Sequence, residues 1–305
     1  MVSPASKRRA VRHASESGLS GIAQACRALG LARSGYYRVV KVSAQRKRRR
    51  NRIVKLSRKH PRYGYRRITA LLRREGGLVN PKCVARVRRA EGLQVRKRQR
   101  RLRRVGPGQQ ARQEAQHRNQ VWSWDFVSDQ VENGSPFRIL TLIDEHTREC
   151  LATHVAWSIR APDVLGVLES AIRKQGAPQH IRSDNGPEFI AYAIQDWAQQ
   201  HQIKMRYIKP GSPWENGYIE SFHDKLRDEC LNREVFGNLA EARVVISEWR
   251  KEYNECRPHS SLGYRTPAEV AARCQTPLRA TPYAPFDSVR EQHNINKPRT
   301  LELHL

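Results

Sequence analysis

The spacing of apolar residues changes near residue 120 of this 305-residue chain. Before that point, short stretches carry an apolar residue at every third or fourth position, which is typical of amphipathic helices. Beyond it, short apolar runs bounded by turn residues precede and separate further helical stretches, which indicates strands and helices in succession. The pattern predicts a helical first third and an α/β remainder.

The first third is predicted to hold two helix pairs with a basic helix between them. The first pair lies in residues 19–39, with Ser20 as a candidate N-cap and Gly30 as a stop between the helices. A helix, a glycine-containing turn and a second helix form the helix-turn-helix pattern. The helix over residues 44–59 follows this pair.

The second pair ends in a helix that begins at Asn80 and Pro81, an N-cap followed by proline in the first turn. Lys82, Arg86 and Arg89 recur along one side of this helix, at i, i+4 and i+7. We interpret that side as a surface for the DNA major groove or for phosphates, and a merely solvated face is the alternative. The candidate DNA-binding residues of this region are Lys82, Arg86, Arg89, Arg66 and Arg67.

The remainder is predicted to form an α/β domain. Strands are expected at Val121–Val127, Phe137–Ile143, Cys150–Ala156, His180–Ser183 and Met205–Ile208. Helices are expected at Pro162–Gln175, Glu188–His201, Asn216–Asn232 and Leu239–Cys256. Three strands joined by short turns, followed by alternating helices and strands, imply a mixed five-stranded sheet with flanking helices.

Charge separates the same two regions. The chain has 57 Lys and Arg residues against 29 Asp and Glu, a net charge of +28. Residues 1–112 hold 34 of the basic residues and only three acidic ones, so the whole excess lies in the first third. Such a segment favours a long polyanion as its partner, and double-stranded DNA comes first. The basic block at 96–104 should bind phosphates without regard to sequence and with strong salt dependence.

Other features exclude several classes of protein. No run of about 18 apolar residues is present, and no apolar stretch follows the basic N-terminus, so neither a membrane partner nor secretion is expected. The six cysteines form no CxxC pair, which disfavours a structural zinc site or a disulfide framework and fits a reducing cytoplasm. The predicted segments are a helix-turn-helix-like segment (1–43), a basic helical DNA-binding module (44–95), a basic linker (96–118), the catalytic core (119–275) and a tail (276–305).

Three acids stand out in the core. Asp125 lies inside an apolar strand, Asp184 directly follows a strand, and Glu220 lies on a helix. A strand centre, a strand end and a helix can place three carboxylates at one end of a sheet, which suits two Mg²⁺ ions in phosphoryl transfer. Alternatives remain at this point, because Asp184 could simply form an Asx turn and Glu220 could be a surface residue. Asp144 is a rival, ranked lower because its neighbours suggest an exposed turn.

Further residues are candidates near this predicted site. Arg227 lies seven residues after Glu220 and could bind a substrate phosphate, or could be an exposed partner of Asp224. His223 lies one turn after Glu220 and could approach the site, although the favoured expectation is that it faces outward. The remaining candidates are Asn185 and Asn216 as ligand-orienting or capping residues, and Arg257 and His259 as DNA contacts.

Motifs across the chain resemble a known family. The matching segments lie at 26–38, 63–68 (Tyr-Gly-Tyr-Arg-Arg-Ile), 124–126 (Trp-Asp-Phe), 181–189, 212–222 and 253–267. The chain resembles the DDE transposases of insertion-sequence family three, of the OrfB type. The resemblance covers about residues 20–275 and implies a retroviral-integrase-like catalytic core of ribonuclease-H-like fold.

The resemblance also implies an activity and a set of residues. The family's catalytic, metal-binding acids fall on Asp125, Asp184 and Glu220, and its following basic residue falls on Arg227. It implies a polynucleotidyl transferase that uses two Mg²⁺ ions, with Mn²⁺ as a substitute, for DNA cleavage and strand transfer at inverted-repeat ends. The expected location is the bacterial cytoplasm, in association with the nucleoid.

Partners and alternatives follow from the same resemblance. Self-association on DNA is expected, because transposition joins two element ends. Transposases of this family are often fused by frameshifting to an upstream frame, so this chain could be a catalytic half that needs a partner protein. A catalytically inactive DNA-binding regulator and an integrase acting on other DNA ends are the competing interpretations.

Overall fold

A computed structural model describes residues 3–38, 43–95, 114–184, 186, 192–208 and 216–274. Contacts divide the chain into two compact units, Met1–Lys59 with Val87–Leu93, and His60–Arg86 with Gln94–Leu305. The basic block at 96–104, Asn185 and the tail at 276–305 lie outside the described residues. Within the described ranges, no helix has both the length and the apolar character required to cross a bilayer.

The first unit begins with three short helices. They are α1 (Pro4–Glu16), α2 (Ile22–Ala28) and α3 (Arg33–Tyr37). Val11, Ala25 and Cys26 form their buried core. The sequence analysis missed α1, although Ser3 accepts a hydrogen bond from the Ser6 N–H as its N-cap and Pro4 occupies the first turn.

The predicted helix-turn-helix pair is present with one change. The N-cap of α2 is Gly21, so the prediction of Ser20 was wrong. Gly30 adopts a φ of 57° just after α2, in the left-handed region that glycine tolerates best, which confirms the predicted stop. Helix α4 spans Ala44–Lys59 as predicted.

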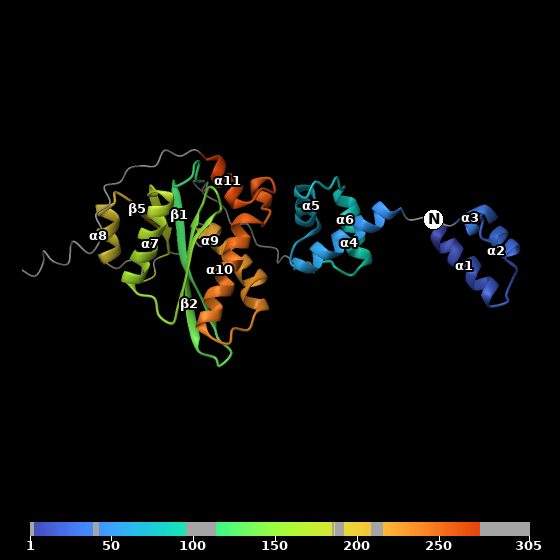
Figure 1. Cartoon of the computed structure of the whole chain (residues 1–305), viewed down its shortest axis with the longest axis horizontal. Helices are drawn as coiled ribbons and strands as arrows, with labels where there is room; N and C mark the ends of the chain where they lie inside the picture. The colour runs from blue at the N-terminus through green and yellow to red at the C-terminus, as the bar shows by residue number, and fades with distance from the viewer. Residues whose placement is uncertain are drawn as a thin grey trace, which may run out of the picture. The chain divides into compact units, whose positions relative to one another are not determined.

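The second unit contains helix α5 (Tyr65–Arg74), the start of α6 (Pro81–Ala90) and the sheet domain. Asn80 caps α6, because its Oδ1 accepts the N–H of Lys82 at 2.8 Å. Figure 1 shows the sheet domain with helices on both faces. Its strands are β1 (Val121–Gln130), β2 (Pro136–Asp144), β3 (Cys150–Ala156), β4 (His180–Ser183) and β5 (Lys204–Tyr207). Its helices are α7 (Ala161–Gln175), α8 (Tyr192–Gln200), α9 (Gly217–Glu229), α10 (Leu239–Glu255) and α11 (Pro267–Arg273).

The five strands form one mixed sheet in the order β3-β2-β1-β4-β5. Strand β1 is antiparallel to β2 and parallel to β4, so the central strand has neighbours of both kinds. This arrangement is the predicted α/β sheet with flanking helices, in the ribonuclease-H-like, integrase-like fold. The predicted helix at Glu188–His201 is described from Tyr192 only.

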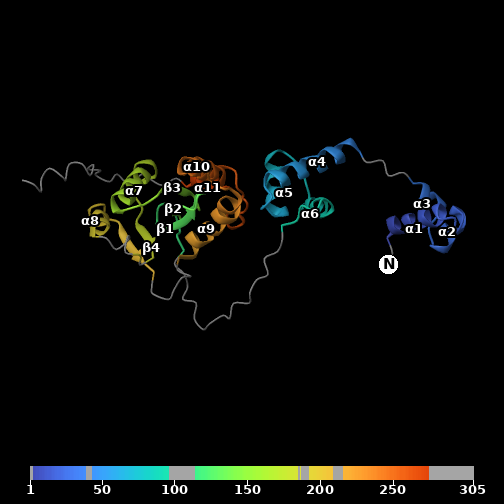
Figure 2. The ribbon, with the colours of Figure 1, turned by 90° about the horizontal axis from the view of Figure 1, so that it is seen from below.

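Helices cover both faces of the sheet (Figure 2). Each face has its own apolar core, and the alternating side chains of β1 contribute to both cores. Trp122 and Trp124 pack on the side covered by α7 and α8. Val127 packs on the opposite side, covered by α9 and α10. Asp125 lies at an odd-numbered position of the same strand and therefore points toward the α9 side.

The segment that precedes α5 packs against the sheet domain within the second unit. Tyr63 is buried and faces the guanidinium of Arg257, whose carbon lies 5.7 Å from the ring centroid. Arg257 is only 1% exposed and forms two hydrogen bonds with Glu229, at 2.7 and 2.5 Å. His259 is buried as well. Because both side chains are enclosed, the expectation of Arg257 and His259 as DNA contacts was wrong.

The turn between β2 and β3 is also buried, contrary to the prediction of an exposed turn. Asp144 accepts hydrogen bonds from the N–H groups of Asn119, His146 and Thr147 at 2.7, 3.0 and 2.7 Å, and from the Thr147 hydroxyl at 2.9 Å. Both oxygens of the Asp144 carboxylate are occupied by these hydrogen bonds, because the short side chain of an aspartate in a turn can accept from several nearby backbone N–H groups. Asp144 thus has a structural role.

Glu145 forms a buried ion pair beside this turn. Its carboxylate accepts two hydrogen bonds from Arg182 of β4, at 2.8 and 3.0 Å, and one from the hydroxyl of Ser123. The three groups join β1, β4 and the β2–β3 turn. Removing these charges from water is unfavourable, and the ion pair with its hydrogen bonds offsets that cost.

Glu145→Gln should therefore lower the free energy of unfolding by about 3–5 kcal/mol, because Arg182 would keep a buried charge without its counter-ion. Urea unfolding of the full chain would measure the loss. Glu248→Gln, an exposed change on α10, is the control and should leave the midpoint unchanged within about 0.5 kcal/mol. Equal effects of the two substitutions would contradict the assignment.

Candidate active site

Asp125 lies on β1, and Asp184 occupies the corresponding position just beyond the end of the neighbouring parallel strand β4. Ser123 of β1 pairs with Arg182 of β4, and the two aspartates each come two residues later. Side chains two residues apart on a strand point to the same face. Asp184 directly follows the last residue of β4, and its Oδ1 accepts the N–H of Gly186 at 3.1 Å. It thus forms the Asx turn considered above and still lies beside Asp125.

Glu220 approaches from helix α9. Ile219, Phe222 and Leu226 anchor this helix on the sheet, and Glu220 in its first turn remains exposed. Apolar positions at this spacing bury one side of a helix and leave the other open. The acid is therefore held at the domain surface by a helix that packs on the face where Asp125 points.

The electrostatics of Asp125 link the three acids. Burial raises the pKa of Asp125 to about 6, and the negative charges of Asp184 and Glu220 act in the same direction. The N–H of Phe126, which donates to its Oδ1 at 2.7 Å, opposes the rise. The side chain is 23% exposed. Three carboxylates thus share one neighbourhood, with Asp125 the most enclosed.

His223 is part of this neighbourhood, and the prediction that it faces outward was wrong. Its Nε2 lies 2.8 Å from Thr141 Oγ1, and its Nδ1 lies 3.7 Å from Asp125 Oδ2. Burial, together with the positive charge of Arg227, lowers the pKa of His223 to about 4. The only sequence signal was its spacing from Glu220, which does not reveal that the underlying strand supplies Thr141.

Arg227 lies farther along α9 and is exposed. Its guanidinium donates to the carbonyl of Ser128 at 3.4 Å. The alternative considered above, a pair with Asp224, is not among the ion pairs of the described residues. The guanidinium is therefore held above the end of β1, with most of its donors still open to solvent.

The candidate DNA-binding residues separate into two environments. Arg66 and Lys82 are exposed and line a groove of about 780 Å³ together with Arg73, Arg265 and Arg273. Arg86 and Arg89 are exposed along α6, as the periodicity predicted. Arg67 differs, because it is half-buried and 3.9 Å from Glu229. It lies in the cluster around Arg257 and contributes to packing.

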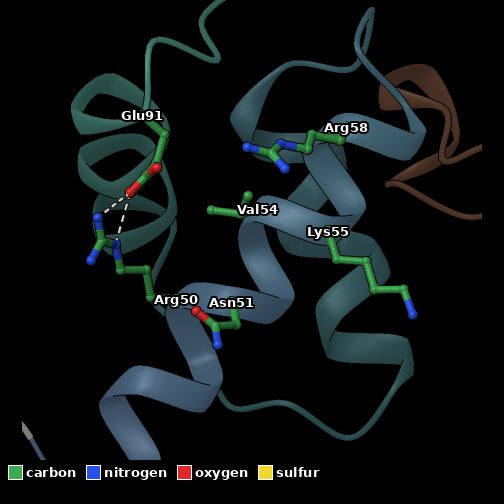
Figure 3. Close-up of a pocket in the computed structure, with 6 residues that line it drawn as sticks. All are labelled: Arg50, Asn51, Val54, Lys55, Arg58 and Glu91. Carbon is green, nitrogen blue, oxygen red and sulfur yellow. Dashed lines mark hydrogen bonds and ion pairs between the residues drawn. The ribbon is translucent and has the colours of Figure 1, made fainter.

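A second basic surface lies in the first unit, on α4 (Figure 3). A cavity of about 510 Å³ is lined by Arg50, Asn51, Val54, Lys55, Arg58 and Glu91. Figure 3 shows Arg50 turned toward Glu91, with which it forms an ion pair. Lys55 points away from that pair. Most of the positive charge of this helix therefore stays available to an anionic partner.

The pKa of Asp125 predicts a pH-dependent stability effect. The folded pKa of about 6 exceeds the ordinary 3.8, so the folded state holds the proton more tightly and stability falls as pH rises between these values. In chelator, Asp125→Asn should raise the free energy of unfolding by about 1–2 kcal/mol at pH 7 and by little at pH 4. Thermal unfolding at both pH values would test this, with exposed Asp224→Asn as control. A gain of equal size at both values would contradict it.

Family models match both the sheet domain and the helical region that precedes it. Two models, both described as integrase core domain, match residues 115–213 and 201–267, and an HTH-like domain matches residues 44–101. A structural comparison with the HTLV-2 integrase catalytic core domain covers 51% of this chain and 98% of that chain, with 18% identity and a TM-score of 0.39.

Several proteins that are similar to this chain in sequence are encoded by bacterial insertion elements. A 39.2 kDa protein of insertion element IS476 from Xanthomonas euvesicatoria is 40% identical over 286 residues, covering 93% of this chain and 82% of the relative. A 31.7 kDa protein of IS407 from Burkholderia multivorans is 41% identical, covering 86% and 93%. The putative transposase InsK of IS150 from Escherichia coli is 28% identical, covering 71% and 80%. The chain belongs to the family of insertion-element transposases with an integrase core.

Proposed function

We propose that this transposase cleaves DNA at the ends of its insertion element and transfers the strands, with Asp125, Asp184 and Glu220 as catalytic acids. The observation that carries the proposal is the shared charge neighbourhood of these residues, which come from β1, the end of β4 and α9. Repelling carboxylates are unfavourable in a fold unless a cation or a proton compensates them. Such an arrangement is typical of a metal-dependent phosphoryl-transfer site.

The donor set fits Mg²⁺ in its chemistry. Carboxylate oxygens are the ligands that Mg²⁺ and Mn²⁺ prefer, and all three acids offer them. Within the described ranges, no group of three His, Cys, Asp or Glu side chains is close enough to enclose a metal ion. The fit therefore rests on donor type and on the negative charges of Asp184 and Glu220, which add to the effect of burial in raising the pKa of Asp125. When bound, two Mg²⁺ ions, or Mn²⁺ in their place, would activate the attacking oxygen and stabilise the leaving one.

The chain's own residues would orient these groups and the DNA. Asp125 has a strand position fixed by sheet pairing, Asp184 directly follows the paired strand β4, and Glu220 has a helix position fixed by apolar packing. Arg227, exposed on the same helix, would pair with a substrate phosphate. Side chains held on strands and helices are placed more accurately than side chains on loops.

Binding of the DNA would be divided among the helical modules and the core. We propose that the segments at 1–43 and 44–95 hold the element ends, that 96–118 links them, and that 119–275 carries the chemistry. The groove that contains Arg66 and Lys82 is lined by six basic residues and one acid, Glu269. Self-association on DNA and an upstream-frame partner of the OrfB type belong to the same proposal, since two ends must be joined.

Cleavage assays would test the catalytic assignment. With labelled duplexes that carry the DNA flanking the gene, Mg²⁺ should yield nicked and strand-transfer products. Asp184→Asn and Glu220→Gln should each reduce them below about one hundredth, because even partners of metal ligands contribute 10–100-fold. Asp224→Asn on the surface of α9 is the matched control. Products that persist in Asp184→Asn would refute the assignment, whereas binding without products from wild type would favour the inactive regulator or the missing partner.

Charge neutralisation in the groove should weaken DNA binding in a salt-dependent way. Lys82→Gln and Arg273→Gln should each reduce the slope of log K against log salt by about one unit, because each removes one phosphate contact. Fluorescence anisotropy with a labelled duplex at several salt concentrations gives this slope. Lys204→Gln, exposed on β5, should leave it unchanged. Identical slopes for the groove variants and the control would exclude the groove as a DNA surface.

A further inference from the structure

His223 lies between one of the proposed catalytic acids and a buried threonine. It is three residues after Glu220 on α9, and only 13% of its side chain is exposed. Its Nε2 lies 2.8 Å from Thr141 Oγ1, and its Nδ1 lies 3.7 Å from Asp125 Oδ2. Thr141 and Asp125 are direct cross-strand partners on β2 and β1. One imidazole ring therefore covers two residues that the sheet already holds side by side.

The hydrogen bonds determine which nitrogen of His223 carries a proton. The hydroxyl of Thr141 donates its single proton to the carbonyl oxygen of Asp125, at 3.0 Å. The hydroxyl oxygen must then accept a hydrogen bond from His223, so Nε2 carries a proton. This bond ties the ring to the sheet through Thr141 and leaves Nδ1 beside the carboxylate.

The side chain of Asp125 is subject to opposing forces. Its Oδ1 accepts the N–H of Phe126, which restrains one oxygen. The like charges of Asp184 and Glu220 act on the carboxylate and push it away from them. The ring is bound to Thr141 of β2 and lies next to Oδ2, so it limits rotation of the carboxylate toward β2, on the side away from β4 and Asp184. Without that ring, repulsion would be free to turn the carboxylate out of the shared neighbourhood.

We propose that His223, tethered by Thr141, is a positioning residue that holds the carboxylate of Asp125 toward Asp184 and Glu220. The inference rests on the proposed function, since it concerns one of the three acids named there. It requires no contact between His223 and the DNA. Its consequence is a site with a defined geometry, and Mg²⁺ demands near-ideal octahedral geometry whereas Ca²⁺ accepts irregular arrangements.

Two matched pairs of variants in the full chain separate the tether from the bulk of the side chains. His223→Ala removes the ring, and His223→Gln can keep a donor near the position of Nε2. Thr141→Val removes the hydroxyl at similar volume, and Thr141→Ser keeps it. Asp224→Asn, next to His223 on the exposed side of α9, is the control. Thermal unfolding in chelator shows whether each variant folds. If Thr141→Val does not fold, the two His223 variants alone test the proposal.

The readouts are metal binding and cleavage. The rise in melting temperature with added MgCl₂ or CaCl₂ gives a half-saturation concentration for each ion. His223→Ala and Thr141→Val should raise the Mg²⁺ value about tenfold, as expected for loss of a residue that orients a metal ligand. The Ca²⁺ value should change much less. His223→Gln and Thr141→Ser should stay nearer to wild type, and cleavage should fall in the same order as Mg²⁺ affinity.

Spectroscopy gives a further readout that does not depend on metal or activity. Nitrogen-15 NMR of wild type in chelator should show His223 protonated at Nε2, and Thr141→Val should alter that signal. Unchanged Mg²⁺ half-saturation in His223→Ala would overturn the proposal. So would equal losses for Mg²⁺ and Ca²⁺, which would indicate general damage to the site. A wild type that neither binds Mg²⁺ nor cleaves DNA would instead refute the proposed function, before any variant is compared.

Discussion

Strand β1 must bury both of its faces and still carry an ionisable side chain in its middle. Trp122 and Trp124 fill the core beneath α7 and α8, so the residues between and after them face the other layer. A carboxylate in that layer loses hydration, and this is why the pKa of Asp125 rises to about 6. The rest of the site is arranged around this constraint. The residue that directly follows β4 supplies a second acid, α9 supplies a third, and Thr141 and His223 border the first.

The buried charges elsewhere in the domain are arranged differently, as pairs of opposite charge. Glu145 with Arg182, and Glu229 with Arg257, are pairs in which each charge lies against its counter-ion. They join distant segments, and their opposite charges compensate each other within the fold. Asp125, Asp184 and Glu220 have the opposite character, because like charges are gathered without a counter-ion among the side chains described around Asp125. The contrast between satisfied pairs and unsatisfied like charges is what distinguishes structural from functional acids here.

Much of the fold could be predicted because the spacing of apolar residues along the chain indicates most of its helices and strands. The boundaries of α4, β3 and β4 agree with the spacing of apolar residues, and the mixed sheet follows from three hairpin-like strands and later helix crossovers. Helix α1 was not predicted, because it has few apolar residues at helical spacing. The N-cap of α2 fell on Gly21 because backbone geometry can replace a capping side chain.

The candidate site was predictable in a more limited way. The sequence alone determined the positions of Asp125, Asp184 and Glu220 in a strand, after a strand and on a helix, because those elements depend on nearby residues. It also determined the basic character of the first third. Only the tertiary structure decided that Asp144, His223, Arg257 and His259 are enclosed, since burial depends on which distant strand or helix lies opposite. Charge and spacing along a chain are local quantities, whereas solvation and hydrogen-bond partners are set by residues up to 195 positions apart, as between Arg74 and Glu269.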